Sequence, residues 1–280
     1  LYHRTLADQT AQAMRYGGGP VEPWQQSLRE KLRELLGYRG DGAERIPLSA
    51  RSLWHREHPL GRIEKVVFTA EPRVDVPAYV CLPKAGEPPY TWFICLQGHT
   101  TGMHNSIGLN YEETDAIEVE GDRDFAISCM RNGMAALCIE QRSFGLRRET
   151  VQPQSLDYLC HQAAMNALML GTTLLAERVF DVDRAIDYLA ERGDADMSRI
   201  GVMGNSGGGT TTLFAAALLP RIRAAMPSCC FSTFRASVQS MFHCVCNYVP
   251  GLLQVAEMGD IAGLIAPRPL VIVNGVEDGI

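Results

Sequence analysis

Short runs of apolar residues, separated by stretches with helical periodicity, constrain the fold of this chain more than any other feature. Residues 92–96, 134–139 and 200–203 are such runs, each short and almost wholly apolar. Runs of this kind are typical of β-strands that are covered on both faces. Helical patterns lie between them, at residues 124–131 and 161–192. Because buried strands that alternate with helices form crossover units, the sequence predicts an α/β fold with a mostly parallel sheet flanked by helices.

Weaker runs extend this pattern along the chain. They predict further strands at residues 63–69, 76–82, 223–226 and 270–273. A helix is expected to follow Ser206 and to stop at Pro220, because proline cannot continue a helix. Residues 229–266 interrupt the alternation and are rich in Phe, Met, Cys and Tyr. We therefore expect a short cap excursion over the edge of the sheet in that region.

The N-terminal part of the chain differs from the rest. The sequence GGGP at residues 17–20 interrupts regular structure, and apolar residues then recur at helical spacing over residues 24–36. Gly37 stands where this helix is expected to end. The helix is amphipathic and must pack either against the main domain or against a partner subunit, so a homo-oligomer is one of two open alternatives. The sequence thus predicts an N-terminal helical extension over residues 1–60 and an α/β domain over residues 61–280.

Charge and composition exclude several function classes. The formal net charge is −6, from 26 basic and 32 acidic residues. A nucleic-acid binder needs clustered basic residues to neutralise phosphates, so nucleic acid is not an expected partner. No run approaches the roughly 18 apolar residues that span a membrane, so no membrane partner is expected either. The 9 cysteines are odd in number and several lie in apolar runs, which favours free thiols in a reducing, cytoplasmic location.

A metal site is only weakly indicated by the sequence. Cys244 and Cys246 lie just after His243, and both residue types are zinc ligands. Their spacing does not match the usual two-residue gap, and no second pair stands nearby in the sequence. We therefore predict no metal site and no cofactor.

The sequence GNSGGG at residues 204–209 is the strongest chemical signal in the chain. It follows a short apolar run and precedes a helix of small residues. This context is typical of a nucleophile elbow, where a serine sits on a tight turn and the residues two positions away lack side chains. Ser206 is the candidate nucleophile, and Gly204 and Gly208 meet the steric need. The alternative is a phosphate-binding glycine loop, but a P-loop needs Lys after its last glycine, and Thr210 stands there.

Acyl transfer also needs hydrogen-bond donors aimed at the developing oxyanion. One donor is normally the backbone N–H of the residue after the nucleophile, which is Gly207 here. The other comes from the loop after an earlier strand, here residues 97–102. In this loop Gly98 permits close approach to the substrate, and the N–H of His99 or Thr100 would donate. The alternative for this loop is an ordinary glycine turn after a strand.

A catalytic acid is expected after the last predicted strand, where it would hold a histidine in the right tautomer. Asp278 is the candidate and Glu277 the alternative, although an acidic residue here could also be an ordinary turn residue. The expected triad order is serine, acid, histidine, and no histidine follows Asp278 before the chain ends at Ile280. His243 lies earlier, in an apolar stretch, and is interpreted as a core or cap residue. The sequence therefore predicts that the chain is C-terminally incomplete and that a histidine beyond Ile280 serves as the base.

Together these motifs resemble the α/β-hydrolase superfamily, and more narrowly its acetyl xylan esterase and dienelactone hydrolase-like branch. The resemblance covers roughly residues 60–280 and rests on QGH at 97–99, EQRSFG at 140–145, GNSGG at 204–208, and APRP at 266–269 before Asp278. It implies the α/β-hydrolase fold and an esterase that acts on small acyl or carbohydrate esters. It also implies that Ser206 and Asp278 are two members of the triad. The candidate substrate-pocket residues are Gln97, Arg142 and His104.

The sequence as a whole predicts a carboxylic ester hydrolase whose partner is a small-molecule ester or carbohydrate ester. Ser206 attacks the carbonyl carbon, a histidine takes its proton, and Asp278 orients that histidine. The N–H groups of Gly207 and His99 hold the oxyanion, and an acyl-enzyme forms and is hydrolysed. Two other hypotheses stay open: a peptidase of the same fold, and a non-catalytic hydrolase-like protein that keeps the pocket for binding.

Overall fold

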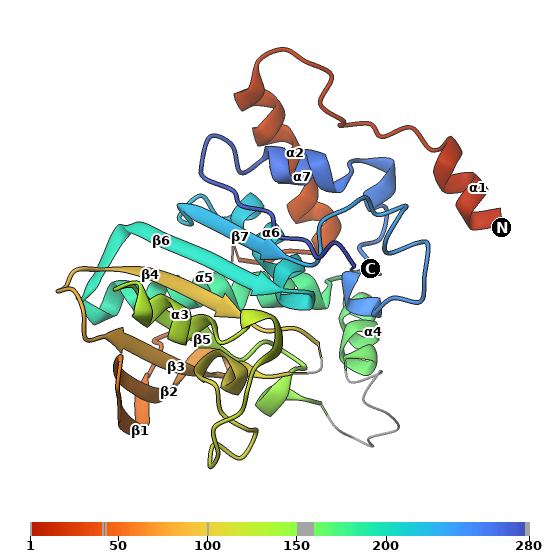
Figure 1. Ribbon diagram of the computed structural model, residues 1–280. Coiled ribbons are helices and arrows are strands. Elements are labelled where there is room, and N and C mark those ends of the chain that lie inside the picture. The colour runs from red at the N-terminus through yellow and green to blue at the C-terminus, as the bar shows by residue number, and fades with distance from the viewer. Residues whose placement is uncertain (1, 41, 43, 100, 150–159, 278–280) are drawn as a thin grey trace.

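A mixed β-sheet forms the centre of the computed structural model (Figure 1). The structure describes residues 2–40, 42, 44–99, 101–149 and 160–277. Over these residues the sheet has 7 strands in the order β1-β2-β3-β5-β4-β6-β7. The strands are β1 (Arg51–His58), β2 (Gly61–Glu71), β3 (Val74–Pro83), β4 (Tyr90–Leu96), β5 (Ala135–Ile139), β6 (Ala195–Asn205) and β7 (Ala224–Ser228).

Strand direction divides this sheet into two halves. β1, β2 and β3 form an antiparallel meander, and β3 is also antiparallel to β5. The strands β5, β4, β6 and β7 are parallel to their neighbours. The carboxyl ends of the parallel strands therefore meet at one edge, where open α/β sheets place their ligand sites. The predicted α/β fold is confirmed, and its parallel half contains the three buried apolar runs.

Helices cover both faces of the sheet. The helices of the described residues are α1 (Tyr2–Gln9), α2 (Val21–Leu36), α3 (Phe125–Arg131), α4 (His161–Met169), α5 (Leu174–Arg192), α6 (Gly207–Leu218) and α7 (Met258–Gly263). α5 and α6 pack on one face of the sheet, and α3 packs on the other (Figure 1). A search of the described helices finds none long and apolar enough to cross a bilayer.

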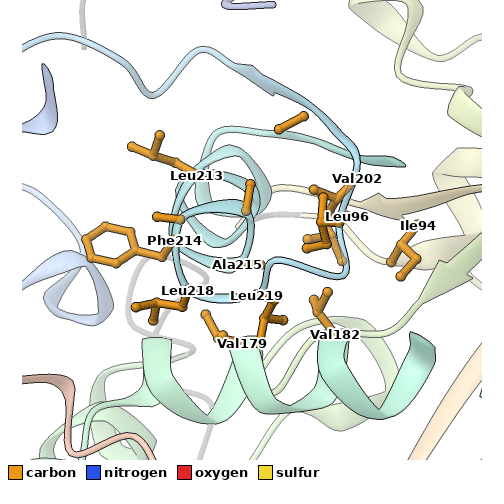
Figure 2. Close-up of a cluster of buried hydrophobic side chains, with 14 of the residues drawn as sticks. Ile94, Leu96, Val179, Val182, Val202, Leu213, Phe214, Ala215, Leu218 and Leu219 are labelled. Atoms are coloured by element: carbon orange, nitrogen blue, oxygen red, sulfur yellow. The ribbon is translucent and has the colours of Figure 1, made fainter. Parts of the chain in front are cut away.

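Side chains that alternate along the strands sort the core into two clusters on opposite faces. Ile94 and Leu137 belong to the cluster that α5 and α6 cover, whereas Cys95 and Cys138 belong to the cluster under α3. Figure 2 shows the first cluster, in which side chains of α5 and α6 meet those of β4 and β6. Burial on both faces explains why these strands are almost wholly apolar. It also holds α6 and the turn before it in a fixed position over the sheet.

The prediction of one helix over residues 161–192 is wrong, because the structure has two helices there, α4 and α5. Gly171 lies between them with a φ of 74°. Thr173 then caps α5, because its side-chain oxygen accepts a hydrogen bond from the Ala176 N–H at 3.1 Å. Such a cap satisfies one of the N–H groups that a helix start leaves without a partner. Local capping thus breaks a helix that the apolar pattern alone would continue.

The predicted last strand, residues 270–273, runs parallel to β7. The Val271 N–H donates to the Ala225 carbonyl at 2.9 Å, and the Val273 N–H donates to the Pro227 carbonyl at 3.1 Å. The segment pairs through isolated bridges and does not form a continuous strand. The region after β7, residues 229–266, is the cap segment. It holds the short turns of helix η5 (Val245–Asn247) and η6 (Leu252–Gln254), followed by α7.

The N-terminal helix α2 packs against the α/β domain. Leu28, Leu32 and Leu36 are fully buried on its inner face. Arg29 Nε donates to the Ala217 carbonyl in α6 at 2.9 Å. Gly37, in the left-handed conformation with a φ of 63°, ends the helix as predicted. The division of the chain at residue 60 stays a prediction, and β1 lies on its N-terminal side.

Candidate active site

Ser206 occupies the turn between β6 and α6, with φ 54° and ψ −119°. A positive φ is strained for a residue other than glycine and persists only where the surroundings enforce it. A Cβ at Gly204 would lie 2.5 Å from the Gly208 carbonyl oxygen, and a Cβ at Gly208 would lie 2.2 Å from the Leu96 carbonyl oxygen. The Ser206 N–H donates to the Ser228 carbonyl at 2.8 Å, which joins the turn to the end of β7. This is the strand, strained turn and helix that a nucleophile elbow requires.

The loop after β4 lies directly beside this turn. A Cβ at Gly98 would lie 3.3 Å from the Ser206 Cβ, so a glycine lets the backbone of the loop come close. The ring of His99 lies close to the start of α6. A Cβ at Gly207 would lie 2.6 Å from Cε1 of this ring. The first N–H groups of a helix have no acceptor within the helix. The structure therefore brings Ser206, Gly207 and His99 together, and their role as an oxyanion site stays a prediction.

Ser206 and Gly207 line a pocket between α6 and the cap segment. Apolar side chains supply much of its wall: Leu213, Phe214, Phe234, Val238 and Met258. A few polar side chains also line it: Thr210, Ser237, His243 and Asn247. An apolar pocket with a small number of polar groups is typical of a site for a small molecule.

His243 is half-buried and lines the same pocket as Ser206. Its Nδ1 lies 3.0 Å from Nδ2 of Asn247. Burial lowers the pKa of His243 below its ordinary value of 6.5, so the ring is neutral at neutral pH. A neutral imidazole is able to accept a proton. The sequence predicted that His243 is a core or cap residue. The structure places it in the cap segment, where it also lines the pocket of Ser206.

Two of the predicted substrate-pocket residues make contacts within the loops beside the site. Gln97 is buried, and its Nε2 donates to Ser106 Oγ at 2.8 Å and to the Arg123 carbonyl at 2.7 Å. His104 is half-buried and meets the ring of Tyr111 edge to face, with ring centres 5.6 Å apart. Neither side chain is among those that line the pocket of Ser206.

Arg142, the third predicted pocket residue, belongs to an ion-pair network between the loop after β5 and helix α5. Its Nε and Nη2 bind the Asp181 carboxylate at 3.0 and 2.9 Å, and Arg147 binds the same carboxylate at 2.6 Å. Burial opposes ionisation of Asp181, but the charges of Arg147 and Arg142 hold its pKa below the ordinary value. Arg142 lines a different cavity, together with Glu71 and Glu177.

The predicted acid, Asp278, lies outside the described residues. Its alternative, Glu277, is the last described residue and is exposed. The chain that leads to both is anchored by Asn274, whose Nδ2 donates to the Phe231 carbonyl at 2.9 Å. The role of Asp278 therefore stays a prediction.

Glu140 is a buried acid whose role the sequence alone did not predict. Its two carboxylate oxygens accept the N–H groups of Met103 and Leu146, each at 3.1 Å. Burial raises the pKa of Glu140 from 4.5 to about 7, against the opposite effect of these hydrogen bonds and of Arg147. The side chain thereby joins the loops after β4 and β5 at the carboxyl edge of the sheet. The sequence did contain a signal for this residue, because Glu140 is an acidic residue that directly follows the buried strand β5.

Sequence comparison connects this chain to known esterases. Residues 121–244 match the model of the acetyl xylan esterase family, AXE1. A curated relative, YtaP of Bacillus subtilis strain 168, is 26% identical over 252 residues, which cover 89% of this chain and 81% of the relative. That relative is itself only provisionally named, as a hydrolase.

Solved structures share the fold. A Bacteroides fragilis protein, provisionally described as an acetyl xylan esterase, has a TM-score of 0.83 at 15% identity and covers 97% of this chain and 73% of its own. Acetyl xylan esterase 1 from Thermoanaerobacterium has a TM-score of 0.57 at 15% identity, over 89% of this chain and 91% of its own. At these identities the structures establish the fold.

Proposed function

Because the chain belongs to the acetyl xylan esterase family of α/β-hydrolases, which its residues 121–244 match, we propose that it is a serine-dependent carboxylic ester hydrolase. The observation that carries this proposal is the position of Ser206, on a strained turn at the lining of a pocket. Strain at such a turn is typical of functional sites, where it holds a side chain in one exposed orientation.

In the proposed reaction, Ser206 Oγ attacks the carbonyl carbon of the ester and its proton passes to an imidazole. The N–H groups of Gly207 and His99 stabilise the oxyanion that forms. The alcohol then leaves with a proton from the imidazolium, and an acyl-enzyme remains. Water attacks the acyl-enzyme and releases the acid.

The base of this reaction is a histidine that Asp278 orients. The chain order of this fold places that histidine after the acid. His243 is the alternative base, because it is neutral and lines the pocket of Ser206. The two alternatives predict different effects of replacing His243.

We propose that the part of the substrate that enters the pocket is a small acyl group. Phe214 from α6 and Phe234 and Val238 from the cap segment bound its apolar side. Several structural relatives are named acetyl xylan esterases, which favours an acetyl group on a carbohydrate alcohol. We therefore propose acetylated carbohydrates as the substrate class.

Replacement of Ser206 tests the proposal directly. Ser206→Ala in the full-length protein should lower kcat for p-nitrophenyl acetate by about 10⁴- to 10⁶-fold, because one member of the catalytic triad is lost. The same variant should lose covalent labelling by a fluorophosphonate probe. Ser52→Ala, at an exposed position in β1, should keep both activities.

The other hypotheses give different results. A peptidase of this fold would cleave peptide p-nitroanilides faster than acetyl esters, with the same dependence on Ser206. A non-catalytic binding protein would show neither turnover nor labelling in the unmodified protein. Retention of more than a few per cent of esterase activity by Ser206→Ala would refute Ser206 as the nucleophile.

A further inference from the structure

Three cysteines and a histidine from three separate segments converge beside the turn of Ser206. They are His99 in the loop after β4, Cys160 at the start of α4, and Cys244 and Cys246 in the cap segment. Their three Sγ atoms and one imidazole nitrogen all lie within 4.8 Å of one another. In Figure 1, α4 lies next to the part of the cap segment that holds η5, and the two elements are in contact.

The separations between these atoms suit a single metal ion. Cys160 Sγ lies 2.8 Å from Cys244 Sγ, which lies 3.3 Å from Cys246 Sγ, and His99 Nε2 lies 3.1 Å from Cys246 Sγ. In a tetrahedral zinc site, with Zn–S of about 2.3 Å and Zn–N of about 2.0–2.1 Å, neighbouring ligand atoms lie roughly 3.5–3.8 Å apart. These three separations are shorter than that value, and all four atoms lie within 4.8 Å of one another, so small side-chain shifts would bring all four atoms within bonding distance of one ion.

A buried cation beside the cluster indicates that the cluster is negatively charged. Arg178 is only 1% exposed. Its Nη1 lies 3.3 Å from Cys246 Sγ, and its Nε and Nη2 donate to the Arg142 carbonyl at 3.1 and 2.9 Å. The guanidinium also lies 4.1 Å from the centre of the Phe144 ring. None of these described partners is a carboxylate, yet a buried guanidinium requires a counter-charge.

A zinc ion with three thiolates and a neutral imidazole supplies that counter-charge. The ion contributes two positive charges and the thiolates three negative charges, so the site has one net negative charge, which Arg178 neutralises. The thiolate is the form in which cysteine binds metals.

Two simpler interpretations explain less of this arrangement. Free thiols buried as small apolar groups are found elsewhere in the chain, as with Cys95 of β4 and Cys129 of α3, which lie in one cluster of apolar residues. Such packing does not account for an imidazole and a guanidinium at the same thiols. A disulfide between Cys160 and Cys244 would remove two of the three thiolates and would leave His99 and Cys246 without a role.

We propose that His99, Cys160, Cys244 and Cys246 bind one zinc ion in a closed Cys₃His site. Thiolates and imidazole in a tetrahedral arrangement are the ligands that zinc prefers. Four protein ligands leave no position for water or substrate, so the ion is structural and takes no part in catalysis. The proposal does not rest on the proposed ester hydrolysis.

The ion would fix the wall of the pocket. It joins the loop after β4 to the stretch of the cap segment that also carries His243 and Asn247, and α4 becomes the third attached segment. The sequence predicted no metal, because Cys244 and Cys246 have the wrong spacing and no second pair lies nearby in the sequence. The fold supplies the missing ligands from 84 residues away for Cys160 and from 147 residues away for His99.

Metal content and X-ray absorption of the unmodified full-length protein test the site without any variant. The protein is purified under reducing conditions from zinc-supplemented medium and dialysed. We expect one zinc ion per chain, and a zinc edge spectrum that fits three sulfur atoms at about 2.3 Å and one nitrogen at about 2.0–2.1 Å. Zinc well below one ion per chain, even after reconstitution with zinc sulfate, or zinc bound only by oxygen and nitrogen, would overturn the proposal.

A matched pair of variants tests the ligands. Cys160→Ser should lower zinc affinity by more than about 100-fold, which exceeds the usual cost of removing an outer-shell partner. Cys129→Ser removes a buried thiol outside the cluster and should retain one zinc ion per chain. Cobalt substitution gives an independent readout, because the thiolate-to-cobalt band should weaken in Cys160→Ser and stay unchanged in Cys129→Ser. Equal zinc affinity of the two variants would exclude Cys160 as a ligand.

Alkylation under denaturing, non-reducing conditions distinguishes the metal from a disulfide. With a chelator present, the zinc site predicts that all 9 cysteines of the chain react. A disulfide predicts that two cysteines stay unmodified and that peptide mapping joins Cys160 to Cys244. That second result, with no zinc bound, would refute the site while leaving the Ser206 tests unaffected.

Discussion

Individual glycines decide whether the turn at Ser206 is able to form. At Gly204 and Gly208, any side chain would meet a backbone carbonyl of the facing segments. Backbone atoms in a packed α/β core shift only at considerable cost, because the strands and helices around them are held by many hydrogen bonds. The glycines are therefore a steric requirement of the strained serine between them.

Gly208→Ala should be strongly destabilising. Its Cβ would lie 2.2 Å from the Leu96 carbonyl oxygen, and relief of such a contact has to move β4 or α6. We expect a loss of about 3 kcal/mol or more in the free energy of unfolding, at the upper end of overpacking effects. Urea denaturation measures this loss. A variant that is insoluble would agree with the same prediction.

Gly259→Ala is the matched control for this prediction. Gly259 is also at a helix, in the first turn of α7, but a Cβ there would have no heavy atom within 4 Å. The substitution should change stability by no more than about 1 kcal/mol, in the stabilising direction that helix propensity gives. Similar effects of the two substitutions would contradict the steric account of the turn.

His243→Ala should retain most of the esterase activity. The proposed reaction gives the role of base to a histidine after the acid, which leaves His243 as a residue of the pocket wall. We expect kcat for p-nitrophenyl acetate to fall by less than about 10-fold, against about 10⁴-fold or more for loss of a true triad member. A loss as large as that of Ser206→Ala would instead identify His243 as the base.

At the scale of elements, a buried ion-pair network joins helix α5 to the loop that follows β5. Asp181 of α5 is only 1% exposed and accepts hydrogen bonds from both Arg142 and Arg147. Removing one partner of a buried ion pair is costly, because the remaining charges lose their compensation in a poorly solvated site. This network holds the loop that also carries Phe144, next to His99.

Asp181→Asn should therefore destabilise the protein by about 3 kcal/mol, within the usual range for breaking a buried pair. Asp75→Asn is the control, because its partner Arg51 and Asp75 itself are 58% and 47% exposed and lie 3.3 Å apart. An exposed pair contributes about 1 kcal/mol or less. Urea denaturation of both variants would contradict this account if the two losses were equal.

At the scale of the whole molecule, one buried carboxyl makes stability depend on pH. Burial raises the pKa of Glu140 from 4.5 to about 7 in the folded protein. Between these values the folded state keeps a proton that the unfolded state has released. The folded state is therefore favoured at low pH, and this contribution is lost as the pH rises from about 4.5 through about 7.

Glu140→Gln should flatten this part of the pH profile. In the unmodified protein, Glu140 alone should lower the free energy of unfolding by up to about 3 kcal/mol between pH 4.5 and pH 7.5. Glutamine does not titrate, so the melting temperature of the variant should fall less over this range. Glu87→Gln, at an exposed position, should leave the profile unchanged. Parallel profiles for Glu140→Gln and the unmodified protein would contradict the assignment.

Local patterns were enough to predict several features of this protein. The apolar runs predicted β4, β5 and the buried part of β6, because a strand segment buried on both faces is poor in polar side chains; the exposed first half of β6 was not predicted. The glycine spacing around Ser206 predicted the elbow, because the steric requirement is confined to residues 204–208. Gly37 marked the end of α2 for the same kind of local reason.

Contacts between distant segments were decided by the tertiary structure alone. The cluster of His99 with Cys160 and Cys246 exists because a loop, a helix start and the cap segment meet in space, and no sequence spacing records that meeting. Likewise, the pairing of Arg142 with Asp181 depends on how α5 packs against the sheet. Backbone conformation and burial follow periodicities of a few residues, whereas a site assembled across the sheet depends on strand order and on the path of the connections.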